Sequence, residues 1–377
     1  MTPRDRVRTA LGRSEPDRVP LDLGLSVTSV HRDAYVALRA CLGLPPRETA
    51  ILDSMQQVVV VDEDVLERFR VDTRQLAVRP ARPWRPVGSG AFRDEWGVTW
   101  RPASGGRYYD MAEHPLAHAG LKDLDRFAWP DPEDSARFDG LVERARRLHE
   151  ETSYAVVLSG FGEATFGLPS WVRGHAQFYQ DLVDGSGMGE AILDRFLDYA
   201  LRLATCTLEL VGPYVDVVRI ADDLGTELGP IISPATYRSL IKPRQRALVE
   251  RIKSKTRAAV LLHSCGSVRE FVGDFVDIGI DALNPVQVSA RGMDSASLKK
   301  EFGDRMSFWG GGCDTQRVLP FGSVEDVRAE VRRRIRDLAP GGGHIFAAVH
   351  NIQFDVAPEK IVALYDTAYE LGRYPVG

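Results

Sequence analysis

From about residue 122 onward, the chain alternates between short apolar runs and longer amphipathic segments of helical period. The apolar runs are nearly continuous, which is typical of strands buried on both faces of a parallel sheet. We predict strands at residues 154–160, 215–223, 258–266, 282–287, 306–313 and 344–351. We predict helices at 134–151, about 170–212, 233–255, 267–279, 293–303, 323–339 and 357–372. Strand–helix units in this unbroken series favour a closed barrel over an open sheet, so the predicted fold class is α/β, a (β/α)8 TIM barrel.

The first third of the chain is less regular. It predicts a helix at 2–13, a strand at 19–24, a helix around 29–42 and β-branched runs at 50–62 and 68–78. Residues 80–110 are rich in Arg, Pro, Gly and Trp, and they alternate aromatic with polar residues around a Gly-Gly pair. This pattern predicts an antiparallel hairpin inserted near the N-terminal third. We therefore expect residues 1–377 to form a single barrel domain with a hairpin insertion at 80–110.

Composition narrows the class of protein. The chain has 377 residues, is 44% hydrophobic and carries a formal net charge of −5. That hydrophobic content suffices for one large core, and the mild negative charge gives no general attraction to nucleic acid or anionic lipid. The start is charged rather than apolar, and no apolar run reaches the length of a membrane span. We expect a cytoplasmic protein without nucleic-acid or membrane partners; the Trp-rich insertion offers a surface for a homodimer.

Polar residues cluster where the predicted strands end. In a barrel these positions line the active site, so side chains far apart in sequence converge there. The strand-end residues in question are Gly160 to Glu163, Asp222 and Asp223, His263 to Gly266, Asn284 and Gln287, Cys313 to Gln316, and His350, Asn351 and Gln353.

Nitrogen and sulfur groups among these residues point to a metal. His263 and Cys265 are two residues apart at the end of an extended run, so their side chains lie on the same side of the strand. An imidazole beside a thiolate suits zinc. Cys313 and His350 add further ligand groups at later strand ends, and a catalytic zinc usually takes three protein ligands. The ordinary alternative is a buried thiol and a polar histidine, and the spacing leaves open which three of the four residues bind.

The remaining strand-end residues suit catalysis and substrate binding. Asp222, Asp223 and Glu163 are candidates for acid–base chemistry, and Glu163 is also a possible oxygen ligand or substrate contact; an aspartate after a strand is alternatively a helix cap. Neutral amides orient a polar ligand without adding charge, so the predicted substrate-binding residues are Asn284, Gln287, Gln316 and Asn351. A further set of aromatic residues forms either an aromatic wall for a ring substrate or ordinary packing, namely Trp84, Trp96, Trp100, Phe161, Phe166 and Trp171.

At these motifs the chain resembles the uroporphyrinogen decarboxylase-like superfamily. The resemblance is carried by residues 3–20, DDLGTELGPIISPATYRSLIKPRQ, HSCGSV, DALNPVQ, FWGGGCDTQRVLP and residues 344–368. It implies a (β/α)8 barrel. True decarboxylases of the superfamily need no metal and hold substrate carboxylates with an Arg-rich N-terminal motif, whereas the matching region here reads VPLDLGLSVTSVHRDAY and lacks it. The zinc methyltransferase branch carries a His-x-Cys motif that His263-Ser264-Cys265 matches, and His350 stands where coenzyme M-type members have a third, cysteine ligand.

The resemblance implies a function. We expect a zinc-dependent methyltransferase of a corrinoid-linked demethylase system, which moves a methyl group from a small methylated donor, such as an O-methyl compound, to a corrinoid protein. No corrinoid-binding motif is present in the sequence, so that cofactor would be carried by a partner protein. The alternative is a cofactor-independent decarboxylase of the uroporphyrinogen decarboxylase type, acting on a carboxylated small molecule.

Overall fold

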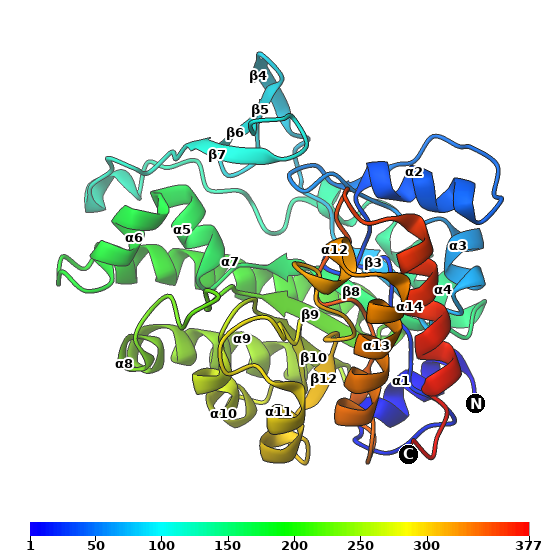
Figure 1. The fold of residues 1–377 in the computed structure, drawn as a ribbon. Helices are drawn as coiled ribbons and strands as arrows, with labels where there is room; N and C mark the ends of the chain where they lie inside the picture. The colour runs from blue at the N-terminus through cyan, green and yellow to red at the C-terminus, as the bar shows by residue number, and fades with distance from the viewer. Residues whose placement is uncertain (377) are drawn as a thin grey trace.

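The computed structural model describes residues 1–376, and its centre is a curved sheet of seven parallel strands (Figure 1). The strand order is β13-β12-β11-β10-β9-β8-β3, so each strand after β8 pairs with its predecessor in the chain. The strands are β3 (Thr73–Ala77), β8 (Ala155–Gly162), β9 (Val217–Ala221), β10 (Ala259–His263), β11 (Ala282–Asn284), β12 (Ser307–Trp309) and β13 (His344–Ile345).

The segment around Leu21 occupies the eighth position of the barrel. Leu21 forms a parallel bridge with Phe346, just beyond β13, and its carbonyl accepts a hydrogen bond of 2.8 Å from the backbone N–H of Asp72, just before β3. Residues 19–24 therefore lie between the two edges of the sheet, as the sequence predicts. The TIM-barrel prediction is confirmed.

Helices surround the strands (Figure 1). They are α1 (Pro3–Leu11), α2 (Arg32–Cys41), α3 (Glu63–Arg68), α4 (Leu141–Glu150), α5 (Gly167–Arg173), α6 (His175–Asp181), α7 (Met188–Val211), α8 (Pro234–Thr236), α9 (Lys242–Lys255), α10 (Arg269–Asp277), α11 (Ser295–Phe302), α12 (Val318–Phe321), α13 (Val324–Leu338) and α14 (Pro358–Leu371). No helix within residues 1–376 combines the length and the apolar character needed to cross a bilayer.

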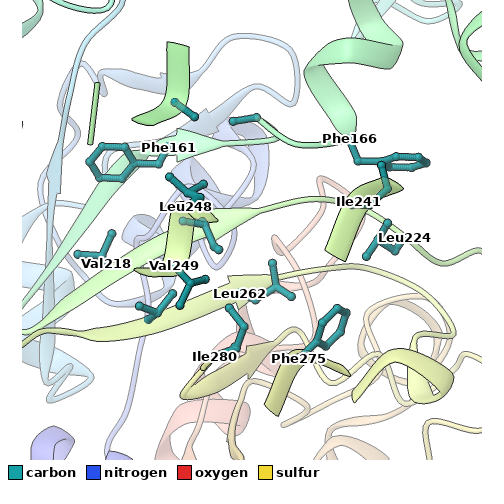
Figure 2. Packing of buried hydrophobic residues seen from close by; sticks show 14 of the residues in the cluster. Phe161, Phe166, Val218, Leu224, Ile241, Leu248, Val249, Leu262, Phe275 and Ile280 are labelled. Carbon is teal, nitrogen blue, oxygen red and sulfur yellow. The ribbon is translucent and has the colours of Figure 1, made fainter. Parts of the chain in front are cut away.

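Alternation along the strands separates two buried layers. Val218 of β9 and Leu262 of β10 point outward and belong to the cluster that packs the strands against α9 and α10 (Figure 2). Their neighbours Val217 and Leu261 belong to a separate interior cluster that also contains Trp309. Successive strand residues point to opposite faces, so the same alternation directs His263, at the end of β10, into the barrel.

The insertion is larger than the predicted hairpin. Instead of two strands, the structure has a four-stranded antiparallel sheet, in the order β4 (Arg85–Gly88), β5 (Ala91–Arg93), β6 (Thr99–Pro102) and β7 (Tyr109–Glu113). A separate two-stranded ladder joins β1 (Ile51–Asp53) to β2 (Val58–Val59). The apolar stretches before Trp96 are too short to distinguish strands from coil, so the sequence predicted one hairpin where the structure has four strands. Figure 1 shows this sheet standing outside the barrel, and Trp100 of β6 packs edge-on against Trp171 of α5.

Candidate active site and metal centre

A cavity of about 410 Å³ lies at the carboxyl ends of the barrel strands. One part of its wall is polar and includes Glu163, Asp223, His263 and His350. Another part is aromatic and apolar, formed by residues that include Trp96, Phe161, Leu168, Trp171 and Tyr199. A small cavity with apolar walls and a few convergent polar groups is typical of a site for a small molecule.

His263 is held in one orientation by Asn284. The Nδ1 atom of His263 lies 2.6 Å from Oδ1 of Asn284, and Nδ2 of Asn284 donates to the backbone carbonyl of Trp309 at 3.0 Å. Because the amide nitrogen donates to that carbonyl, Oδ1 faces the ring and accepts a hydrogen bond from the N–H at Nδ1. The lone pair of the neutral ring is then on Nε2, which points toward Cys265 at 3.4 Å from Sγ.

Cys265 is positioned by two loops whose backbones nearly touch. Its N–H donates to Oδ1 of Asp223 at 2.8 Å. Gly266 has φ of +84°, and a Cβ at this residue would lie 2.3 Å from the backbone of Gly225, in the loop after β9. Only glycine combines that backbone angle with that approach, so the Gly after Cys265 belongs to the construction of the site.

His350 completes a cluster of three ligand groups. One ligand atom from each of His263, Cys265 and His350 lies within 4.8 Å of the others, and this is the one such cluster found among residues 1–376. The two imidazole rings are 5.6 Å apart, centroid to centroid. Burial lowers the pKa of His350 to about 4, aided by the neighbouring His263, so its ring is neutral near pH 7. Burial, with the carboxylates of Asp223 and Glu163, raises the pKa of the Cys265 thiol well above its usual range.

This cluster fits a zinc ion. Zinc bonds of about 2.0–2.3 Å to nitrogen and sulfur, in tetrahedral geometry, place ligand atoms about 3.3–3.6 Å apart. The 3.4 Å between His263 Nε2 and Cys265 Sγ matches this spacing, and the third ligand is within reach after a small inward shift. A divalent cation would displace the thiol proton, because the thiolate is the ligand form. Three protein ligands leave one position open toward the cavity.

Cys313 does not join this cluster, which corrects its candidacy as a ligand. It is fully buried in a hydrophobic cluster with Leu319 and Phe346. Its Sγ contacts only the carbonyl of Asp314, at 3.9 Å, among the described hydrogen-bond partners. Following a strand does not fix which way a side chain points, and here Cys313 packs into the apolar cluster instead of lining the cavity.

Asp222 is a helix cap, which corrects its prediction as a catalytic residue. Its Oδ1 accepts hydrogen bonds from the N–H groups of Phe166 and Gly167, at 2.7 and 3.1 Å, where α5 begins. Its Oδ2 accepts from Thr165 Oγ1 and from Nε2 of Gln245. Burial raises the pKa of Asp222 to about 6 against the lowering effect of these donors.

Asp223 and Glu163 both line the cavity. Oδ1 of Asp223 lies 3.8 Å from Nε2 of His263, and the Asp223 side chain is half-exposed. Glu163 has φ of +59°, and its side chain packs against the first residue of α5, where a Cβ on Gly167 would collide with it. Burial raises the pKa of Glu163 well above its usual range, and the charges of Asp223 and Asp222 add to this effect.

The four amides predicted to bind substrate hold loops instead and do not line the cavity. Asn284 orients His263, as described above. Gln287 accepts from the Gly266 N–H at 2.7 Å, and both Gln287 and the exposed Gln316 donate to Glu227 at the rim. Asn351 is buried, accepts from the Ser29 N–H and donates to the carbonyl of Ser26 and to Gln56. Asn351 uses both N–H donors of its amide, and the other three amides bond to His263 or to groups outside the cavity, so their role is to position the site.

Several lining residues were not predicted from the sequence. Arg219, in the middle of β9, and Asp53 and Ser26, from the N-terminal third, all line the cavity. An arginine inside the apolar run VDVVRIADD was the one available signal, since a buried strand rarely contains a charge. Of the six aromatic candidates, Trp96, Phe161 and Trp171 line the cavity. Trp84 instead stacks on Phe92, and Phe166 packs against Phe178.

A larger hollow of about 1010 Å³ opens at the opposite end of the barrel. It is lined by Arg8 of α1, by Asp216 just before β9 and by Ala259 at the start of β10. Barrel enzymes carry their active sites at the carboxyl ends of the strands, so the smaller cavity beside His263 is the candidate active site.

The fold and this cavity define a (β/α)8-barrel enzyme with a candidate metal centre at its mouth. The chain belongs to the uroporphyrinogen decarboxylase family: the family model described as "Uroporphyrinogen decarboxylase (URO-D)" matches residues 109–371. A uroporphyrinogen decarboxylase from Thioalkalivibrio sulfidiphilus is 24% identical over 71% of this chain and 75% of its own length. One from Alkalilimnicola ehrlichii is 25% identical over 74% and 73%. Among solved structures, a methyltransferase from Methanosarcina mazei has the same fold, with a TM-score of 0.66 at 18% identity over 98% of this chain and 99% of its own.

Proposed function

We propose that this enzyme is a zinc-dependent methyltransferase of a corrinoid-linked demethylase system. It would transfer a methyl group from a small methylated donor to a corrinoid carried by a partner protein. The observation that supports this proposal is the convergence of His263, Cys265 and His350 beside the cavity at the barrel mouth. Two imidazoles and a thiol are a ligand set for zinc with one open position.

Zinc bound there would act as a Lewis acid on the heteroatom that carries the methyl group. The chain's own residues supply the rest of the site. Trp96, Trp171 and Leu168 give the cavity an apolar wall that binds the donor and excludes water. When the methyl group leaves an ether oxygen, that oxygen keeps the bonding electron pair and needs a proton. Burial raises the pKa of Glu163 well above its usual range, so Glu163 is suited to donate that proton.

Two further observations support the methyltransferase proposal. The N-terminal segment contributes Ser26 and Val27 to the cavity in place of an Arg-rich motif, and the arginines that line it, Arg79, Arg137 and Arg219, come from later in the chain. The methyltransferase from Methanosarcina mazei shares the fold over almost the full length of both chains.

A decarboxylase is the second candidate, because curated relatives covering more than 70% of the chain are named uroporphyrinogen decarboxylase. It would act without a metal. In that case the cluster of His263, Cys265 and His350 would have no catalytic part, and release of carbon dioxide from a porphyrinogen would continue after chelation.

Metal analysis of the purified full-length protein tests the proposal. We expect about one tightly bound zinc per chain, lost in Cys265→Ser and in His350→Ala. Methyl transfer from methoxylated donors to a Co(I) corrinoid protein should disappear in the same variants and after chelation, and should return with added zinc. Cys313→Ser is the matched control: it alters a buried thiol outside the cluster and should keep its zinc. Full activity in a metal-free protein would refute the proposal.

A further inference from the structure

The buried arginines of this chain share a pattern with one exception. Six of them form a salt bridge with an aspartate or glutamate at no more than 2.9 Å. These six are Arg6, Arg39, Arg74, Arg137, Arg173 and Arg334. Arg219, with 8% of its surface exposed, has no carboxylate within 4 Å in the described part of the chain. A buried charge is normally paired, so Arg219 needs a separate explanation.

Arg219 faces the cavity from the barrel interior. In the register of β9 with β10, Arg219 pairs with Leu261 and Ala221 pairs with His263, so Arg219 lies two residues below the level of the metal cluster. Two residues of a strand span about 6.6 Å. The hydrogen bonds of Arg219 to residues 1–376 run from Nη2 to Ser26 Oγ at 3.0 Å and from Nε to Ser159 Oγ at 3.4 Å. The guanidinium retains unused donors beside a cavity that it lines.

We propose that Arg219 binds the carboxylate of the substrate, so that this cavity takes small carboxylated molecules with an apolar or aromatic body. The inference rests on the proposed function for the reaction, but the binding site stands on its own geometry. A guanidinium presents parallel N–H donors that match the two oxygens of a carboxylate. The body of the ligand would lie against Trp96 and Trp171, and its reacting group would reach the level of His263.

The surroundings favour an anion here. The acidic groups whose charges act most strongly on the guanidinium of Arg219 are Glu163 and Asp53, and both line the cavity. Neither of them forms a salt bridge with Arg219 in the described part of the chain, and burial raises the pKa of each. The backbone of Ser26 is held in place, because the Ser26 N–H donates to Gln75 at 2.7 Å and the Ser26 carbonyl accepts from Asn351 at 3.0 Å. Ser26 therefore offers a positioned hydroxyl beside the guanidinium.

Ligand binding tests this inference without any methyl transfer. Benzoate and 4-methoxybenzoate, each compared with its neutral amide, can be titrated into the zinc-loaded full-length protein and followed by calorimetry and by intrinsic tryptophan fluorescence. We expect the carboxylates to bind more tightly than the amides, and Arg219→Gln to weaken carboxylate binding by about 10- to 100-fold with little effect on the amides. Arg219→Lys should retain part of the preference for carboxylates over amides, because the lysine ammonium keeps the positive charge but lacks the parallel N–H donors of the guanidinium. Arg85→Gln, an exposed arginine on β4, is the matched control.

The outcomes separate this inference from the proposed function. A protein without zinc or methyl transfer whose benzoate binding still depends on Arg219 would refute the reaction and keep the carboxylate site. Methyl transfer from neutral donors, with no preference for carboxylates in the wild type, would keep the reaction and overturn the role of Arg219. Thermal unfolding serves as the folding control: Arg219→Gln removes an unpaired buried charge and should not lower the midpoint, whereas Arg137→Gln leaves Glu95 unpaired and should lower it.

Discussion

The side-chain oxygen of Asn284 lies 2.6 Å from Nδ1 of His263, while the nitrogen of the same amide donates to the carbonyl of Trp309. The barrel backbone therefore determines which nitrogen of His263 is protonated. It places the proton on Nδ1 and the lone pair on Nε2, facing Cys265 and His350. Ligand histidines in metal sites are commonly oriented by a partner of this kind, and loss of the partner typically costs 10- to 100-fold in metal affinity.

We predict that Asn284→Ala weakens zinc binding by about 10- to 100-fold, because the ring of His263 loses both its orientation and its fixed tautomer. Competition with a chromophoric chelator measures this affinity. Asn284→Asp keeps an acceptor at the same place and should bind zinc more tightly than Asn284→Ala. Gln316→Ala removes an exposed amide at the rim and is the control. Equal zinc affinity in the wild type and Asn284→Ala would show that the amide does not support the metal.

The barrel could be predicted from the sequence because parallel strands buried on both faces leave continuous apolar runs, such as AAVLLH before Cys265. The same reasoning placed His263 and His350 at one end of the barrel, since parallel strands all end on the same side. The β4–β7 sheet was seen only as one hairpin. Its strands are three to five residues long, and β4 is exposed throughout, so it lacks the apolar alternation that distinguishes strands from coil.

The roles of the polar residues were harder to predict, because they depend on where loops lie. Asp222 and Asp223 are adjacent, but one turns to the start of α5 and the other to the cavity. The alternation of strand residues predicts that the two side chains point to opposite sides, but it does not predict which of them faces the cavity. The amides were assigned to substrate because neutral hydrogen-bonding groups suit ligands. In the structure Asn284, Gln287 and Asn351 are bonded to backbone groups of a neighbouring strand and neighbouring loops, which are remote in sequence.

We predict that substitutions of the two adjacent aspartates lower the free energy of unfolding by different amounts. Asp222→Ala leaves the N–H groups of Phe166 and Gly167 and the amide of Gln245 without their acceptor, so the free energy of unfolding should fall by about 3 kcal/mol. Asp223→Ala should lower it by less than about 1 kcal/mol, because that side chain is half-exposed. Denaturant titration measures both values.

Activity should follow the reverse order. Asp223 faces Nε2 of His263 and accepts from the N–H of Cys265, so Asp223→Ala should reduce turnover and zinc retention in a protein that remains folded. Asp222→Ala, assayed well below its unfolding temperature, should retain its zinc. A stable, zinc-free Asp222→Ala protein would contradict the assignment of Asp222 as a helix cap.

His344, at the start of β13, predicts a pH dependence of stability that is independent of the metal centre. Its Nε2 lies 3.1 Å from the carbonyl of Gly310, and its Nδ1 is buried without a partner among the described residues. Burial, with a smaller effect of Lys299, lowers the pKa of His344 from 6.5 to about 4. Between these two values the unfolded chain binds a proton that the folded protein does not, so folding becomes less favourable as the pH falls.

We therefore expect His344 to remove up to about 3 kcal/mol from the free energy of unfolding as the pH drops from 6.5 to 4. His344→Gln keeps a donor for the carbonyl of Gly310 and cannot be protonated, so its stability should depend less steeply on pH over this interval. Denaturant titrations at closely spaced pH values, on chelated protein to exclude metal loss, measure both slopes. His118→Gln, an exposed histidine, controls for the loss of one histidine from the chain. If His344→Gln and His118→Gln both show the same slope as the wild type, the pH dependence of the free energy of unfolding originates at another residue, and the prediction for His344 is wrong.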